Sequence, residues 1–223
     1  MSQNFLKLMR NGDLAAVTSA LENDPSLAEY RDAQGVSSVL WAVYTGQTAI
    51  RDLLLKTRAQ SGKALDVFEA AATGEEGRLH AILGADEAAA QAMSGDGWTA
   101  LHLAAAFGTP MSAAALIFRG ARVDAVSKNP QRNQPLHAAL ALGRNTSTIE
   151  LLLAHGADAN AVQTAGYTAI FSAATANRKD LAELLVMHGA DPKHVNEQGK
   201  TPADFARERG HTELAAWLDG SAG

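Results

Sequence analysis

Residues 97–108 read GWTALHLAAAFG, and this stretch decides the fold. Gly97 is typical of a turn, Thr99 is typical of a helix N-cap, and the alanine-rich run that follows favours a short helix. Gly108 closes the stretch, as glycine does where a helix ends in the left-handed conformation. The stretch therefore predicts a turn, a short helix and a stop.

Related stretches recur along the whole chain. Their closing residues are Gly12, Gly46, Gly74, Gly108, Gly143, Asn177 and Gly210, at intervals of 34, 28, 34, 35, 34 and 33 residues. Asn177 supports this alignment, because asparagine comes next after glycine in tolerating the left-handed conformation. A period near 33 residues indicates a solenoid of stacked repeats.

Each full copy contains two helix signals. The first helix starts with a polar cap followed by proline or alanine, in the pairs Thr99-Ala100, Gln134-Pro135, Thr168-Ala169 and Thr201-Pro202. A more apolar second helix follows, with the core runs Leu53–Leu55, Leu116–Phe118, Leu151–Leu153 and Leu184–Val186. Two such helices form an antiparallel hairpin, and the polar residues after the second helix suit a projecting finger loop.

These motifs resemble the ankyrin repeat. The family pattern Gly-x-Thr-Pro-Leu-His-x-Ala is matched by Gly97–Ala104 and again by Asn133–Ala139, and its second half is matched by Leu151–Asn160. The resemblance covers about residues 4–220. It implies an all-α, ankyrin-type solenoid of stacked helix-turn-helix repeats with short β-hairpin-like finger loops.

The resemblance also implies one domain, residues 1–220, followed by a frayed tail at 221–223. About seven repeats are expected, at 4–34, 35–62, 63–96, 97–131, 132–165, 166–198 and 199–220. The 28-residue interval leaves too few residues for a full finger at Arg58–Lys63. A truncated loop and a local irregularity in the stack are therefore predicted there.

In the ankyrin family, a Thr hydroxyl and a His imidazole tie the turn to adjacent repeats. Thr99 and His102 carry both members here, whereas His137 is paired with Gln134. In the remaining repeats the histidine position is assigned to Leu40, Phe68, Phe171 and Asp204. The hydrogen-bonded tie is expected to be lost in those repeats, while the apolar replacements still pack.

The composition excludes several kinds of site and partner. The chain has 223 residues, a net charge of −5 and no cysteine, which excludes disulfides and thiolate metal sites. No block of lysine and arginine is present, so neither nucleic acid nor an anionic membrane is an expected partner. No signal-peptide pattern and no long apolar run occur, so a cytoplasmic protein is expected. A protein exported by a specialised secretion system would look the same.

No motif points to catalysis, a cofactor or a metal. Gly95–Ala100 matches a dinucleotide fingerprint, but the preceding Ala88–Met93 is not a β-branched run, and the repeat register explains the glycines. His188, Asp191 and His194 are close in sequence, but a glycine turn divides them. No Gly-x-Ser-x-Gly nucleophile elbow occurs. The chain is therefore predicted to be no enzyme, without cofactor or metal.

The resemblance assigns a binding surface. In ankyrin arrays the residues just before the closing glycine and just after the turn glycine line a concave groove. The candidate partner-binding residues carried over in this way are Val36, Tyr44, Thr45, Trp98, Phe107, Asn133, Leu142, Tyr167 and Thr175. Exposed aromatic side chains are typical of interface hot spots, which favours binding. The alternative is that these side chains, Tyr44 among them, pack between neighbouring fingers. Trp98 and Tyr167 occupy equivalent positions in their repeats, which a structural role would also produce.

Together these features predict a non-catalytic protein–protein interaction module. It would bind an unidentified protein partner through its concave groove and finger loops, as a monomer. Three alternatives stay open: a secreted bacterial effector that uses the same surface, a self-assembling structural protein, and an enzyme with dispersed catalytic residues in the groove.

Overall fold

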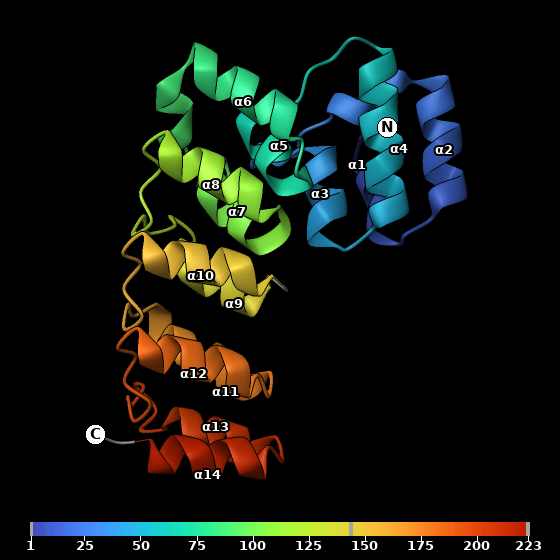
Figure 1. Ribbon diagram of the computed structural model, residues 1–223. Helices are drawn as coiled ribbons and strands as arrows, with labels where there is room; N and C mark the ends of the chain where they lie inside the picture. The colour runs from blue at the N-terminus through green and yellow to red at the C-terminus, as the bar shows by residue number, and fades with distance from the viewer. Residues whose placement is uncertain (1, 143–144, 222–223) are drawn as a thin grey trace.

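The computed structural model describes residues 2–142 and 145–221, which form fourteen α-helices and three short 3-10 helices (Figure 1). The first half of the chain contains α1 Ser2–Arg10, α2 Leu14–Asn23, α3 Ser38–Tyr44, α4 Thr48–Gln60, α5 Val67–Thr73, α6 Glu76–Ala85, α7 Ala100–Phe107 and α8 Pro110–Phe118. The second half contains α9 Pro135–Ala141, α10 Thr146–Ala154, α11 Ala169–Thr175, α12 Lys179–Met187, α13 Pro202–Glu208 and α14 Thr212–Gly220. The 3-10 helices are η1 Pro25–Glu29, η2 Glu87–Gln91 and η3 Thr164–Gly166.

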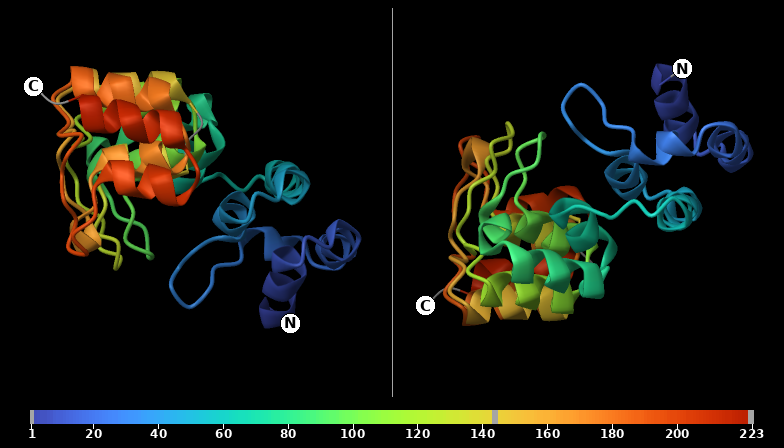
Figure 2. Two further views of the ribbon diagram at one scale, coloured as in Figure 1. Left: turned by 90° about the horizontal axis from the view of Figure 1, so that it is seen from below. Right: turned by 90° about the horizontal axis from the view of Figure 1, so that it is seen from above.

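The helices follow one another in antiparallel pairs, from α1 and α2 to α13 and α14, which we number as repeats one to seven. From α5 to α13, the first helix of each pair packs on the first helix of the next. The second helices α6, α8 and α10 also pack on one another, which gives two layers of helices. Finger loops extend along one side of the stack (Figure 2). The architecture is therefore the all-α repeat fold that the sequence predicts.

Five finger loops share one hydrogen-bond register. The backbone amide of Asp32, Ser94, Ser127, Gln163 or Asn196 donates to the carbonyl across its own turn, at 2.8–3.0 Å. No such turn lies between α4 and α5, since residues 61–66 lead directly from one helix into the other. The predicted truncated loop is confirmed. As a result, repeats one and two lie beside the stack of repeats three to seven rather than on top of it (Figure 1).

A buried ion pair closes this junction. Nη1 of Arg58, at the end of α4, lies 2.6 Å from Oε1 of Glu69 in α5, and both side chains are buried. Nearby, Nη2 of Arg31, which comes from the finger of repeat two, lies 2.6 Å from Oδ2 of Asp66. The junction therefore depends on paired charges that are partly removed from water, a costly arrangement when either partner is lost.

The finger of repeat two meets the finger of repeat four directly, because repeat three has no finger between them. A Cβ on Gly95 would lie 1.7 Å from the carbonyl oxygen of Gln34, so the two backbones touch. Val36, Leu40, Ala72 and Leu103 form a small apolar cluster at the same place. This cluster joins the core of repeats one and two to the longer core of repeats three to seven.

Most of the predicted helix stops are confirmed. Gly12, Gly46, Gly74, Asn177 and Gly210 all have positive φ, with 54° at Asn177. Gly143 lies outside the described residues. Gly108 also ends its helix, α7, but the left-handed conformation expected there is wrong, since its φ is −83°. A Cβ on that residue would lie 2.2 Å from the carbonyl oxygen of Ala71, so glycine is needed there for the close approach of α5 and α7.

In repeat three, the residue equivalent to His102 is Glu69 rather than Phe68, one position later than the sequence predicts. The third helical residue of α5 is Glu69, and Glu69, not Phe68, forms the capping box with Asp66. Asp204 also lacks the histidine but forms a capping box with Thr201. At the C-terminus, Ser221 donates its backbone amide to the Trp217 carbonyl at 2.9 Å. The frayed tail expected at 221–223 stays a prediction, and residues 222–223 lie outside the described residues.

Candidate protein-binding surface

Three of the predicted site residues meet in one aromatic cluster. Tyr44 ends α3, Phe107 ends α7, and Trp98 comes from the finger before α7. The ring centroids lie 5.5 Å apart for Tyr44 and Phe107, 6.5 Å for Tyr44 and Trp98, and 6.3 Å for Trp98 and Phe107. These separations are typical of favourable aromatic pairs. The three rings therefore pack against one another across repeat three, and each is only partly exposed.

A hydrogen bond fixes Tyr44 in this cluster. Its hydroxyl donates to Oδ2 of Asp96 at 2.8 Å. Burial raises the pKa of the Tyr44 phenol well above its ordinary value, and the adjacent carboxylate of Asp96 raises it further. The phenol therefore stays protonated and keeps its role as a donor. The rings of Tyr44 and Trp98 therefore mainly pack against neighbouring repeats, which is the alternative to partner binding that the sequence leaves open.

Two predicted residues face the interior, and their assignment is corrected here. Val36 is 2% exposed and belongs to the apolar cluster at the repeat junction. Asn133 is 7% exposed, and its Oδ1 accepts a hydrogen bond from the Ser127 hydroxyl at 2.6 Å. In both cases the finger turn directs the side chain inward, where a partner protein would not touch it.

A second group lies further along the same inner helices. Leu142 follows α9 and is 50% exposed. Tyr167 comes from the next finger and packs edge to face on Phe171 and Phe205. Its ring centroid lies 5.2 Å from that of Phe171 and 5.6 Å from that of Phe205. Thr175 ends α11 and is partly exposed. These residues do not join the cluster around Tyr44.

A shallow cleft of about 280 Å³ separates repeats five and six beside this second group. Its lining includes the predicted residues Tyr167 and Thr175 together with the small residues Ala141 and Ala176. A wider cleft of about 560 Å³ is bordered by Phe107 and by the start of α10. Thr45, by contrast, lies on open surface, and its hydroxyl donates to the Trp41 carbonyl at 2.8 Å.

Histidines tie neighbouring repeats together. The buried rings of His102 and His137 reach the next finger, with Nε2 at 3.0 Å from the Asn133 carbonyl and 2.9 Å from the Ala161 carbonyl, respectively. Burial lowers the pKa of His102 from 6.5 to about 4 and also lowers the pKa of His137. Both rings are therefore neutral at pH 7. His194 makes a similar contact with the Gly166 carbonyl at 3.0 Å.

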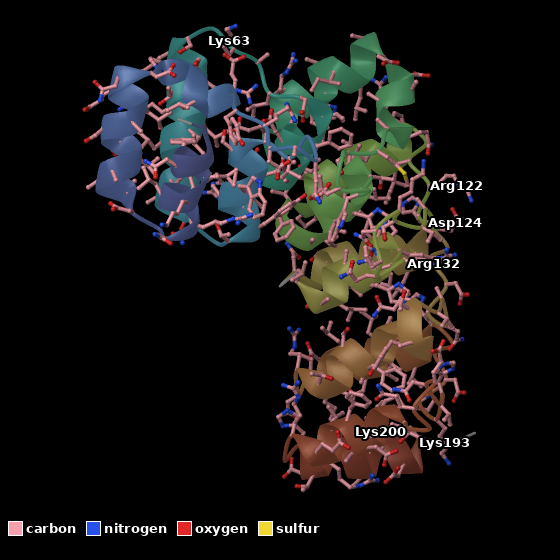
Figure 3. The ribbon with its side chains drawn as sticks, turned by 180° about the vertical axis from the view of Figure 1, so that it is seen from behind. Lys63, Arg122, Asp124, Arg132, Lys193 and Lys200 are labelled. Carbon is pink, nitrogen blue, oxygen red and sulfur yellow. The ribbon has the colours of Figure 1, made fainter. Side chains whose placement is uncertain are left out.

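The finger side of the stack carries charged side chains. Arg122, Asp124, Arg132 and Lys193 lie along this side in Figure 3, whereas Lys63 lies apart on the linker to α5. Nη2 of Arg122 lies 2.9 Å from Oδ2 of Asp124, and this hydrogen-bonded pairing lowers the pKa of the carboxyl. Arg132 and Lys193 form no ion pair with any described residue. The finger side can therefore offer cations to a partner.

The described residues contain no group of three His, Cys, Asp or Glu side chains that could hold a metal ion. Around the suspected dinucleotide fingerprint, Gly97 has a φ of 84° and sits in a finger turn that pairs Met93 with Thr99. No buried strand precedes it within the described chain, as that fingerprint requires. Among the described helices, none is long and apolar enough to cross a membrane.

Sequence reasoning missed a set of exposed apolar side chains on the second helices. Phe118 is 86% exposed, Met187 is 82% exposed and Met111 is 59% exposed. Phe118 was assigned to a core run with Leu116, yet it points into solvent. One signal could have revealed Met111 and Phe118: α8 contains no charged residue, although it is a surface helix.

The comparison with protein families agrees with this architecture. The family model described as ankyrin repeats (3 copies) matches residues 67–163 and 136–221. These matches begin at α5, where the regular stack also begins. The comparison with curated proteins finds no match. The family matches span more than half of the chain, and the paired helices, fingers and histidine ties follow the same repeat, so the chain belongs to the ankyrin repeat family.

Proposed function

We propose that this protein is a non-catalytic binding module that holds a partner protein on the concave face of repeats five and six. Ankyrin repeats are in general protein–protein interaction modules and are typically non-catalytic. The observation that carries the proposal is the cleft beside Tyr167 and Thr175, which lies between two inner helices and opens on their surface. Residues 1–220 would act together as one repeat domain.

The cleft has the composition of a contact site. Tyr167 provides a ring whose position is fixed by Phe171 and Phe205. The small side chains of Ala141 and Ala176 leave room for a partner side chain beside that ring. A rigid aromatic anchor next to a shallow depression is the arrangement found at interface hot spots. Leu142 adds an exposed apolar side chain at the end of α9.

The other exposed residues would extend this surface. Phe107 borders the cleft at the start of α10, and Thr45 lies on open surface in repeat two. The exposed cations Arg132 and Lys193 on the finger side would select partners by charge, because charge at the rim of an interface governs specificity more than affinity. A cytoplasmic location and a monomeric state stay predictions, and light scattering checks the second.

Partner capture tests the proposal. The wild-type protein, the groove variant Leu142→Glu with Thr175→Arg, and the control Leu14→Glu are immobilised after circular dichroism has shown that each is folded. Leu14 is 42% exposed at the start of α2, so it is close to Leu142 in exposure and lies away from both the cleft and the finger side. Lysate of the source cell is passed over each, and the retained proteins are identified by mass spectrometry.

We expect a protein that is retained by the wild type and the control and is lost from the groove variant. Equal retention by all three proteins would place the binding site elsewhere on the molecule. Capture of nothing by the wild type would contradict a stable partner. Turnover of a substrate by the wild type that the groove variant lacks would favour the enzyme alternative.

A further inference from the structure

Helix α8 presents an apolar face to solvent. Met111 is 59% exposed and Phe118 is 86% exposed. The two residues are seven positions apart, so they lie on the same face of the helix, two turns or about 10 Å from each other. Ala114 lies between them and is partly exposed. An exposed phenylalanine and methionine on one helix face mark an interaction site more often than single apolar residues do.

The corresponding faces of the next two outer helices are polar at two of the three positions. When the N-cap residues Thr109, Asn145 and Arg178 are aligned, Met111 corresponds to Ser147 in α10 and to Asp180 in α12. In the same alignment Ala114 corresponds to Glu150 and Glu183. At the position of Phe118, α10 carries Ala154 and α12 carries the exposed Met187. In α10 and α12, which follow α8 in Figure 1, acidic side chains therefore replace Ala114, while α12 keeps an exposed apolar residue at its end.

The helix on the other side of α8 leaves space. Helix α6 packs against α8 and carries Gly77 and Gly84 at the positions that correspond to Met111 and Phe118. A Cβ added to either glycine would meet nothing within 4 Å, so both positions open to solvent. At these two positions the backbone of α6 lies uncovered beside the large side chains of α8, while the exposed His80 lies between the two glycines at the position that corresponds to Ala114. The surface is low on the α6 side and raised along α8.

We propose that this surface, Met111, Ala114 and Phe118 of α8 with Gly77 and Gly84 of α6, binds an amphipathic α-helix of a partner protein that is basic on one side. Apolar anchors of that helix would contact Met111 and Phe118, the mode in which helices bind shallow apolar surfaces. Lysine or arginine on the side facing α10 would meet Glu150. The proposed site lies on the outer helices and is independent of the concave site.

The acidic residues beside this surface favour a basic partner helix over a second copy of this chain. Glu150 is exposed and forms no ion pair with any described residue, while Glu183 pairs only with the exposed Lys179 at 3.5 Å. Exposed pairs of this kind are weak, so Glu183 is available to a partner. The chain carries a net charge of −5. A second copy would bring its own acidic helices toward these carboxylates, and like charges across an interface disfavour it.

Two synthetic helical peptides of about 20 residues test the proposal, since that length spans about 30 Å. Both carry leucine at i, i+4, i+7 and i+11 on one face; one has lysine on the flanks and the other has glutamate. Binding is measured by fluorescence anisotropy to the wild type and to Met111→Ser with Phe118→Ser, Glu150→Lys, and Leu142→Glu. The serine variant replaces exposed side chains only, and thermal melting checks its fold.

The lysine peptide is expected to bind the wild type, to lose roughly tenfold or more in affinity on the serine variant, and to bind Leu142→Glu unchanged. Glu150→Lys is expected to weaken the lysine peptide and strengthen the glutamate peptide. No binding to the wild type, or equal binding of both peptides, would overturn the proposal. A wild-type dimer in light scattering that the serine variant abolishes would instead assign the surface to a second copy.

Discussion

The Tyr44 hydroxyl donates a hydrogen bond to Oδ2 of Asp96 at 2.8 Å, and this bond connects repeat two to the finger of repeat four. The two residues are 52 positions apart in the chain. They meet because repeat three contributes no finger, which lets the fingers on either side of it touch. Tyr44→Phe removes the bond and keeps the ring. We expect a loss of about 1 kcal/mol in the free energy of unfolding, measured by urea denaturation.

A double-mutant cycle checks that this loss belongs to the Tyr44–Asp96 pair. Asp96→Asn alone and combined with Tyr44→Phe should give a coupling energy of about 0.5 kcal/mol or more, as residues in direct contact do. Strict additivity of the two changes would show that the pair contributes nothing.

Two threonines in equivalent helix caps should respond differently to the same substitution. The Thr99 hydroxyl lies 2.8 Å from Nδ1 of His102, whereas the buried Thr168 hydroxyl has no hydrogen-bond partner among the described residues. We expect Thr99→Val to lower the free energy of unfolding by about 1–2 kcal/mol. Thr168→Val should cost less than about 0.5 kcal/mol or stabilise the protein, because no hydrogen bond is lost. Equal losses in the two melting curves would contradict this difference.

Acid should weaken the stack through His102. Burial lowers the pKa of this ring to about 4, against 6.5 in the unfolded chain. Between these values the unfolded state binds the extra proton, so stability is full above about pH 6.5 and is lost as the pH falls toward 4. The loss from this ring alone is at most about 3 kcal/mol. Urea denaturation at several pH values measures it, and His102→Gln should flatten the profile; parallel profiles would exclude His102 as the cause.

The buried pair Arg58 and Glu69 should matter far more than an exposed pair. Arg58→Met leaves the Glu69 carboxylate buried. Its remaining polar contacts among the described residues are the Asp66 backbone amide, 2.9 Å from Oε2, and Nη2 of Arg31, 3.7 Å from Oε1. We expect a loss of about 3 kcal/mol in the free energy of unfolding. The matched control is Arg51→Met, which breaks the exposed pair with Asp52 and should cost less than about 1 kcal/mol. Similar losses in the two variants would refute a special role for the junction.

Two glycines at the ends of first helices should also differ. Gly46 has a φ of 68° and open space around it, so Gly46→Ala should cost about 1–2 kcal/mol through backbone strain alone. Gly108→Ala places a Cβ 2.2 Å from the Ala71 carbonyl, and the backbones of α5 and α7 must separate. We expect a loss of about 3 kcal/mol or more in thermal or urea unfolding. A loss at Gly108 smaller than that at Gly46 would show that α5 and α7 can separate at little cost in free energy.

The sequence by itself determined the repeat and the places where its helices begin and end. Helix starts at Thr99 and Thr201, stops at Gly46 and Asn177, and the missing finger after α4 all follow from local preferences. These features depend on backbone conformation and on the number of residues in a loop, which are written in short stretches of chain. For that reason the fold could be predicted, together with the place where the stack becomes irregular.

Only the tertiary structure decided which way the side chains of the finger turns point and what they meet. Val36 and Asn133 are buried, and Tyr44, Trp98 and Phe107 close on one another across a repeat that lacks a finger. Gly108 is needed because α5 approaches it, although its φ is ordinary. Such contacts join residues from different repeats, and their geometry depends on how the repeats stack. The repeat pattern therefore predicted the positions on the surface, and the stacking determined which of them stay open to a partner.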